Sequence, residues 1–145
     1  MVKEIGVQQL LSALGETGKA PVLILDPSGV SETFFKYKAI LVMAYNEREA
    51  IPSALKNRFM ASVRTGGTLV LSIDEDKSPF DYFDADAFPE EVLDQSKLTE
   101  DFLSHFLESD QWCSLHKDFR FVTLQKTHEI PEWAGPFSII KILPN

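Results

Sequence analysis

The residues best placed to do chemistry form a turn at 26–31, which follows an apolar run at 21–25. A strand, a glycine-containing turn and a helix start are the parts of a phosphate-binding loop. In such a loop, backbone N–H groups and the helix N-terminus hold the anion. The candidate cofactor-binding residues of this turn are Asp26, Ser28, Gly29 and Ser31.

The same turn lacks several features of a working phosphate loop. Pro27 removes one N–H donor, only Gly29 lets the backbone approach a ligand closely, and the first lysine after the turn is Lys36. Asp26 places a carboxylate where phosphates would lie, and like charges about 4 Å apart cost about 1–4 kcal/mol near a surface. We therefore favour a structural strand-to-helix turn, with nucleotide or anion binding as the alternative.

A second candidate is the acidic pair Asp74 and Glu75, which directly follows the apolar run at 68–73. An acidic group at the end of an apolar strand holds Mg²⁺ in phosphate-loop ATPases. That interpretation has force only beside a competent phosphate loop. We therefore predict no cofactor, and ATP with Mg²⁺ is the alternative.

Other groups of metal-binding residue types have a plainer interpretation. The carboxylates of Asp81, Asp84 and Asp86 lack the glycine and final glutamate of a calcium loop, so we expect a solvated loop. Cys113 and His116 have a zinc-like spacing, but no second pair lies nearby. No G-x-S-x-G motif of a hydrolase occurs. We therefore predict no metal site and no catalytic residue.

The elements that must position these residues alternate between strand and helix. Apolar or alternating segments predict five strands, and helical spacing, capping residues and prolines predict the helices between them. Such alternation is typical of an α/β fold, a parallel sheet with helices on both faces. Ligands then bind at the carboxyl ends of the strands, in the loops after Leu25, Ile73 and Lys126. The strands are expected at 21–25, 39–44, 68–73, 118–126 and 137–143.

The helices are expected to begin with an amphipathic stretch from the N-terminus through Leu14. Ser31 is expected to cap the next helix, Pro52 to begin the helix at 50–64, and Thr99 to cap a later one. A short helix is expected from Pro89. Aromatic side chains alternate with the acidic ones in the segment after the third strand. We expect them to pack inward, with an exposed contact patch as the alternative; they are Phe80, Tyr82, Phe83 and Phe88.

Composition limits the class of protein. The chain has 145 residues and a formal charge of −8, which suits one domain over 1–145 and disfavours nucleic acid as a partner. Its single cysteine fits a reducing compartment, and it has neither an apolar run of membrane-spanning length nor a signal peptide. We expect a cytoplasmic protein with no membrane partner. The helix-like start leaves open that the chain is a fragment of a larger protein.

Three segments in register resemble the AAA modules of dynein heavy chains, especially the fifth module. They are "APVLILDPSGVSETFFK", "ALKNRFMASVRTGGTLVLSIDED" and "HKDFRFVTLQKTHEIPEWAGPFSIIKILPN", and the resemblance covers roughly residues 20–143. The chain departs from the family in lacking the tryptophan that follows the "D-P" turn. Its segment 76–112 is also longer than the family's and has its own helix.

The resemblance implies a phosphate-loop NTPase fold of three layers, whose five parallel strands have the order 5-1-4-3-2. By position, Asp26–Gly29 stands at a degenerate Walker A loop, and Asp74 and Glu75 stand near the second acidic motif. Gln125 and Lys126 fall where the family has a polar, sensor-like pair. In the family such a module does not hydrolyse nucleotide and acts structurally within a larger motor.

Three functions follow as hypotheses. The first is a catalytically inactive AAA-like module that binds a protein partner or neighbouring domains of a larger chain, in a cytoskeletal or ciliary setting. The second is a nucleotide binder or weak NTPase that uses Asp74 or Glu75 with Mg²⁺. The third is a small-molecule enzyme with a pocket at the strand ends.

Overall fold

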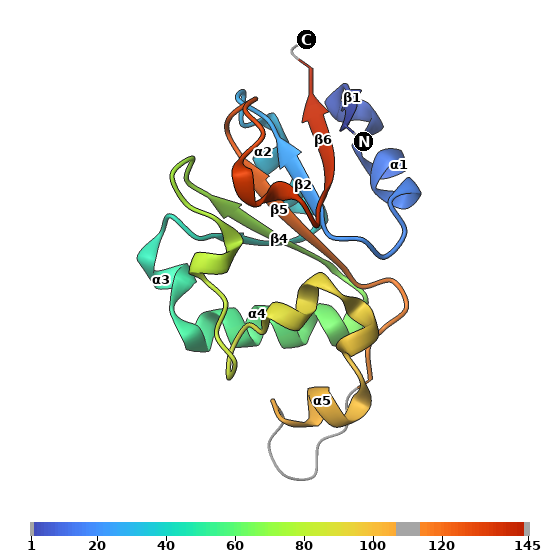
Figure 1. Cartoon of the computed structure of the whole chain (residues 1–145), viewed down its shortest axis with the longest axis vertical. Coiled ribbons are helices and arrows are strands. Elements are labelled where there is room, and N and C mark those ends of the chain that lie inside the picture. Colours follow the sequence, from blue (N-terminus) through green and yellow to red (C-terminus); the bar gives the residue numbers. More distant parts are fainter. Residues whose placement is uncertain (1, 107–113, 144–145) are drawn as a thin grey trace.

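A six-stranded, all-parallel sheet forms the centre of the computed structural model, which describes residues 2–106 and 114–143. The strand order is β1-β6-β2-β5-β4-β3, so the carboxyl ends of all six strands lie at one edge (Figure 1). The strands are β1 (Val2–Ile5), β2 (Val22–Leu25), β3 (Ile40–Met43), β4 (Thr68–Ile73), β5 (Arg120–Gln125) and β6 (Ser138–Ile142).

Helices alternate with these strands along the chain. The α-helices are α1 (Leu10–Glu16), α2 (Val30–Lys38), α3 (Glu47–Ala50), α4 (Pro52–Thr65) and α5 (Glu100–Ser104). The 3-10 helices are η1 (Val7–Gln9), η2 (Pro79–Asp81), η3 (Glu90–Leu93), η4 (Gln95–Lys97) and η5 (Glu132–Ala134).

Two apolar cores, one on each face of the sheet, give the domain three layers. On one face, Leu10 and Leu14 of α1 and Phe35 of α2 pack against the central strands. On the other face, Phe59 of α4 packs against the sheet together with the segment that precedes β5. The ring of Phe59 lies edge-on to three phenylalanines of that segment, those of Phe88, Phe106 and Phe119. The predicted arrangement of helices on both faces is confirmed.

All five predicted strands are present, and they follow the implied order as β6-β2-β5-β4-β3. The prediction of a five-stranded sheet is nevertheless wrong, because β1 adds a sixth strand beside β6. The start of the chain was expected to be helical, whereas Val2 to Ile5 pair with Ile139 to Ile142 and α1 begins at Leu10. Only Ile5 of this edge strand is buried, so the sequence has no alternating pattern there.

The predicted ends of helices α4 and α5 are confirmed. Pro52 occupies the first turn of α4, and Gly66 ends that helix with a φ of 77°. The Thr99 hydroxyl accepts a hydrogen bond from the N–H of Phe102, as expected of a cap. These ends were predictable because proline, glycine and a capping hydroxyl act on the backbone within a few residues.

The aromatic segment before β5 packs mainly inward. Phe88 is buried, and Tyr82 and Phe83 pack partly buried against the core, whereas Phe80 is 39% exposed. The inward prediction is confirmed for three of the four rings. No helix within 2–106 and 114–143 has the length and apolar character to cross a membrane.

Candidate functional site

The turn after β2 is filled by its own side chain. Asp26 is 1% exposed, and its Oδ1 accepts hydrogen bonds from the Ser28 N–H (3.0 Å) and the Ser28 hydroxyl (2.6 Å). Its Oδ2 accepts from the N–H of Ser31 at 2.7 Å. The donors that a phosphate loop would offer to an anion therefore bind this carboxylate instead.

The charge of Asp26 is stabilised where it lies. Burial would raise the pKa of this carboxyl, but the hydrogen bonds from Ser28 and Ser31 outweigh burial and lower the pKa below its usual 3.8. The carboxylate also lies at the positive end of the α2 dipole. Asp26 is thus an ionised, buried anion at neutral pH.

Gly29, and not Ser31, is the N-cap residue of helix α2. Gly29 adopts a φ of 76° at the N-cap position, a left-handed conformation that glycine adopts without strain. Ser31 lies inside the first turn, so its prediction as the capping residue is wrong. The first N–H groups of α2 donate to side chains of the preceding turn: the Val30 N–H donates to Ser28 Oγ at 3.3 Å, and the Ser31 N–H donates to Asp26 Oδ2.

Lys126 brings a positive charge to this turn from a distant part of the chain. Its Cε and Nζ lie 3.4 and 3.9 Å from the position that a Cβ on Gly29 would take. Its ammonium is 3.6 Å from a carboxylate oxygen of Glu32 and 5.5 Å from the centroid of the Tyr45 ring. The sequence has no lysine after the turn before Lys36, but the structure brings Lys126 to Gly29 from the residue that follows β5.

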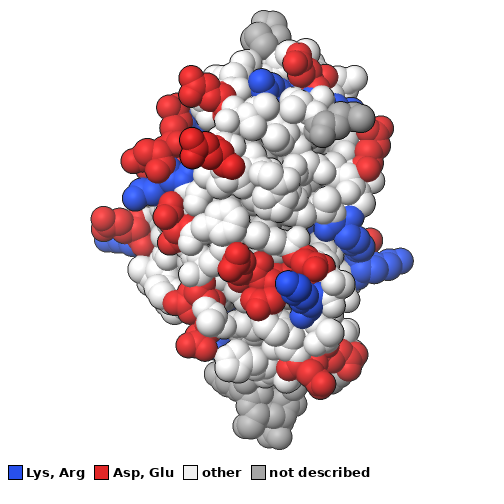
Figure 2. Space-filling view, in the orientation of Figure 1, with Lys and Arg blue, Asp and Glu red and all other residues white. Residues whose placement is uncertain are grey.

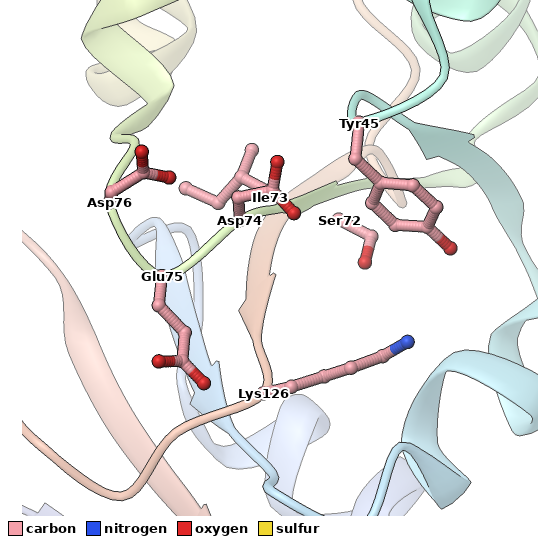
Figure 3. Close-up of a pocket in the computed structure, with 7 residues that line it drawn as sticks. All are labelled: Tyr45, Ser72, Ile73, Asp74, Glu75, Asp76 and Lys126. Atoms are coloured by element: carbon pink, nitrogen blue, oxygen red, sulfur yellow. The ribbon is translucent and has the colours of Figure 1, made fainter.

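A cavity of about 500 Å³ opens at the carboxyl ends of β4 and β5 (Figure 3). In Figure 3, the Lys126 side chain extends along it toward Tyr45, and Glu75 and Asp76 lie on the opposite side. The loops at this edge are therefore not packed shut. The lining residues are Tyr45, Ser72, Ile73, Asp74, Glu75, Asp76 and Lys126.

Glu32 of α2 ties the loops around this cavity together. The Tyr45 hydroxyl donates a hydrogen bond to Glu32 Oε1 at 2.8 Å, and the Ser72 hydroxyl donates to Oε2 at 2.6 Å. The Glu32 side chain is 16% exposed, and Lys126 is the cation beside it. These residues come from α2 and from the carboxyl ends of β3, β4 and β5.

Tyr45 is a hydrogen-bond donor at this site. Burial, the hydrogen bond to Glu32 and the charges of Glu32, Glu49 and Asp74 raise the pKa of Tyr45 to about 12. The phenol therefore stays protonated at neutral pH and cannot act as a general base.

Gln125, the last residue of β5, connects the turn after β2 with the loop after β4. Its backbone oxygen accepts from the N–H of Asp26 at 2.9 Å. Its buried side-chain amide donates to the backbone oxygens of Asp74 (3.0 Å) and Lys77 (2.9 Å). The loop at 74–77 is therefore held in place by a side chain of the neighbouring strand.

Four of the six predicted site residues line a cavity, in two pairs at two different cavities, and Gly29 and Ser31 line neither of these. Asp74 and Glu75 line the cavity of about 500 Å³. Asp26 and Ser28 line another, of about 320 Å³, whose remaining lining residues are Pro27, His128 and Ile142.

Glu32 and Tyr45 were not predicted at this site, and Lys126 was placed only by the resemblance, in a polar, sensor-like pair, and not among the binding residues. The predicted strand order carried the signal that could have found Lys126. It directly follows β5, and β5 pairs with both β2 and β4.

Within the described ranges, no group of three or more His, Cys, Asp or Glu side chains could hold a metal ion. Asp81, at the end of η2, and Asp84 and Asp86, in the segment after it, are exposed. The His116 Nδ1 accepts a hydrogen bond from the N–H of Asp118, and Cys113 lies outside the described residues. The carboxylates of the described acidic segments therefore do not come close enough together to bind one metal ion.

Sequence likeness assigns this chain to no family: no family model matches it, and no curated protein matches it. The structure places it among α/β proteins with an all-parallel six-stranded sheet.

Proposed function

We propose that this chain is a protein-interaction module on a phosphate-loop type of core, of the kind found in dynein AAA modules, and that it turns over no nucleotide. The order β6-β2-β5-β4-β3 supports this core, as does the turn that leads from β2 into α2. The module would bind a protein partner or neighbouring domains of a longer chain. A cytoplasmic, cytoskeletal or ciliary setting is part of the proposal.

The observation that carries the proposal is the buried Asp26 carboxylate. It accepts the hydrogen bonds of Ser28 and Ser31 that a phosphate would need. A phosphate beside it would meet a like charge at a cost of about 1–4 kcal/mol for each pair about 4 Å apart. The turn thus keeps the shape of an anion site and supplies the anion itself.

Calorimetric titration with Mg²⁺-ATP and Mg²⁺-ADP to millimolar concentration tests this proposal, together with thermal melts. We expect no binding heat and no change in melting temperature. A site held at 100 times its Kd would add about 2.7 kcal/mol to the free energy of unfolding, which a melt would register. A nucleotide-dependent rise in melting temperature would overturn the proposal.

Nucleotide binding or weak NTPase activity is the second candidate, and the position of Lys126 favours it. The Lys126 ammonium lies over Gly29 and lines the same cavity as Asp74 and Glu75. If nucleotide binds, Lys126→Gln and Asp74→Asn should each abolish binding. Lys97→Gln, at a cavity that shares no residue with this one, should leave binding unchanged.

A small-molecule enzyme has weaker support. The cavity is large enough for a ligand, but its tyrosine is a protonated donor and its lysine lies beside a carboxylate. A protonated tyrosine cannot act as a general base.

A further inference from the structure

We infer that the cleft at the carboxyl edge of the sheet receives a basic segment of a partner protein that also carries apolar side chains. The inference rests on the proposed interaction function and names the class of partner. The cleft consists of the cavity of about 500 Å³ and an adjoining one of about 420 Å³.

The two cavities adjoin because Glu75 and Asp76 line both of them. The second cavity extends the cleft along the loop that follows β5, as far as the first residue of η5. Its lining residues are Glu75, Asp76, Gln125, Thr127, Glu129, Ile130, Pro131 and Glu132. Together they form a continuous surface that is larger than either cavity alone.

The cleft carries an excess of negative charge. The carboxylates that line it are those of Asp74, Glu75, Asp76, Glu129 and Glu132. Lys126 is the one cation among the lining residues, and it lies 3.6 Å from Glu32. Acidic side chains also gather in Figure 2 at the upper left, where Figure 1 has the loops after β4 and β5. A cleft lined by one sign of charge concentrates ligands of the opposite sign.

Two exposed apolar side chains give the partner more than charge to contact. Tyr45 in the first cavity is 41% exposed, and Ile130 in the second is 48% exposed. Lys126 already holds its ammonium over the Tyr45 ring. Because a cation already lies over that ring, we expect the partner's apolar side chains, and not its basic ones, to contact Tyr45.

The other ligand classes fit this cleft less well. The carboxylates repel phosphates and nucleic acid. The described carboxylates do not come together as a metal site. A basic segment matches both the charge and the apolar contacts. The hydrogen bonds of Gln125 fix the loop at 74–77, so little ordering of that loop opposes binding.

The test is the fluorescence anisotropy of a labelled peptide of alternating lysine, leucine and arginine. Its control peptide has glutamine in place of every basic residue. We expect the basic peptide to bind, with affinity falling as salt rises, and the control peptide not to bind. The double variant E75K/D76K should weaken binding about tenfold or more, because it replaces attraction by repulsion at the middle of the cleft.

The matched control is E90K/E91K, which makes the same change of net charge at η3, in a cavity that shares no residue with the cleft. It should change affinity less than about threefold. For the apolar contact, Ile130→Ser should weaken binding several-fold. Ile51→Ser, at a similarly exposed isoleucine outside the cleft, should not.

Equal weakening by the two double variants would mean that only net charge matters, and it would overturn the inference. So would binding of the glutamine peptide with equal affinity, or no binding of the basic peptide at low salt. Each of these results leaves the proposed function standing, provided that nucleotide fails to bind. Nucleotide binding by the wild type would instead sink the proposed function.

Discussion

Asp26 is an unusual buried group, because its charge is compensated by hydrogen-bond donors of its own turn. Three donors on Ser28 and Ser31 bind it, and each such bond to a charged group contributes about 1.5–3 kcal/mol. Removing the charge would leave these donors poorly satisfied. The same residue that disfavours phosphate therefore holds the start of α2 in place.

Asp26→Asn should lower the free energy of unfolding by about 1–3 kcal/mol at pH 7, because an amide cannot accept all three bonds. The pKa of Asp26 is lower in the folded than in the unfolded state, so its contribution is present above about pH 3.8 and disappears as the pH falls further. Urea unfolding at a series of pH values should show the two proteins converging at low pH. Asp76→Asn, at an exposed carboxylate, should change stability by less than about 0.5 kcal/mol.

Tyr45 reports on the charge of Glu32. The pKa of Tyr45 is raised to about 12 by burial and by Glu32, so Glu32→Gln should move this pKa back toward 10. The raised pKa adds stability that is complete below pH 10 and is lost as the pH rises through 12. Ultraviolet titration, with Tyr45→Phe to assign the signal, measures the shift. An unchanged Tyr45 pKa in Glu32→Gln would contradict the hydrogen bond between them.

At the scale of elements, two glycines in or after helices should respond to alanine in opposite ways. Gly66 has a φ of 77°, and a Cβ there would lie 2.4 Å from His116 Nδ1, so Gly66→Ala should destabilise by more than about 1 kcal/mol. Gly15 lies inside α1 with no atom within 4 Å of an added Cβ, so Gly15→Ala should stabilise by about 0.5–1 kcal/mol. Chemical denaturation measures both, and effects of the same sign would contradict this account.

Helices and strands could be predicted from the sequence where their own residues have an apolar pattern or a capping residue. The apolar runs gave β2 and β4, and Pro52 and Gly66 gave both ends of α4. The strand β1 was missed because its structure depends on a partner, since Val2 to Ile5 pair with the far end of the chain and three of these four residues are exposed. Hydrogen bonding to a remote strand leaves no periodicity to detect.

At the scale of the whole molecule, the location of the site in the fold could be predicted from the sequence, but several of the residues that form it could not. The carboxyl edge of the sheet follows from the parallel order alone. Lys126 and Gly29, by contrast, lie far apart in the sequence and meet only because β5 pairs with β2. The other contacts of the site depend on side-chain conformations that the strand order does not give, such as the hydrogen bonds of Tyr45 and Ser72 to Glu32.

Amide hydrogen exchange should follow the position of each strand in the sheet. The central strands β2 and β5 pair on both sides and are almost wholly buried, so their amides should exchange slowest. The edge strand β1 should exchange fastest, and β3, an edge strand with more burial, should lie between. Exchange measured by NMR tests this order, and equal protection of β1 and β5 would contradict it.

The hydrogen bonds from Gln125 to the loop after β4 have a consequence for how the sequence of this protein can evolve. The Gln125 side-chain amide donates to the backbone oxygens of Asp74 and Lys77. Because these hydrogen bonds involve only the backbone of the loop, they do not depend on the side chains that the loop carries. Glu75 and Asp76 are exposed, so we expect that they can be replaced without disturbing the sheet. Mutations can therefore change the exposed side chains of this loop while the path of its backbone stays the same.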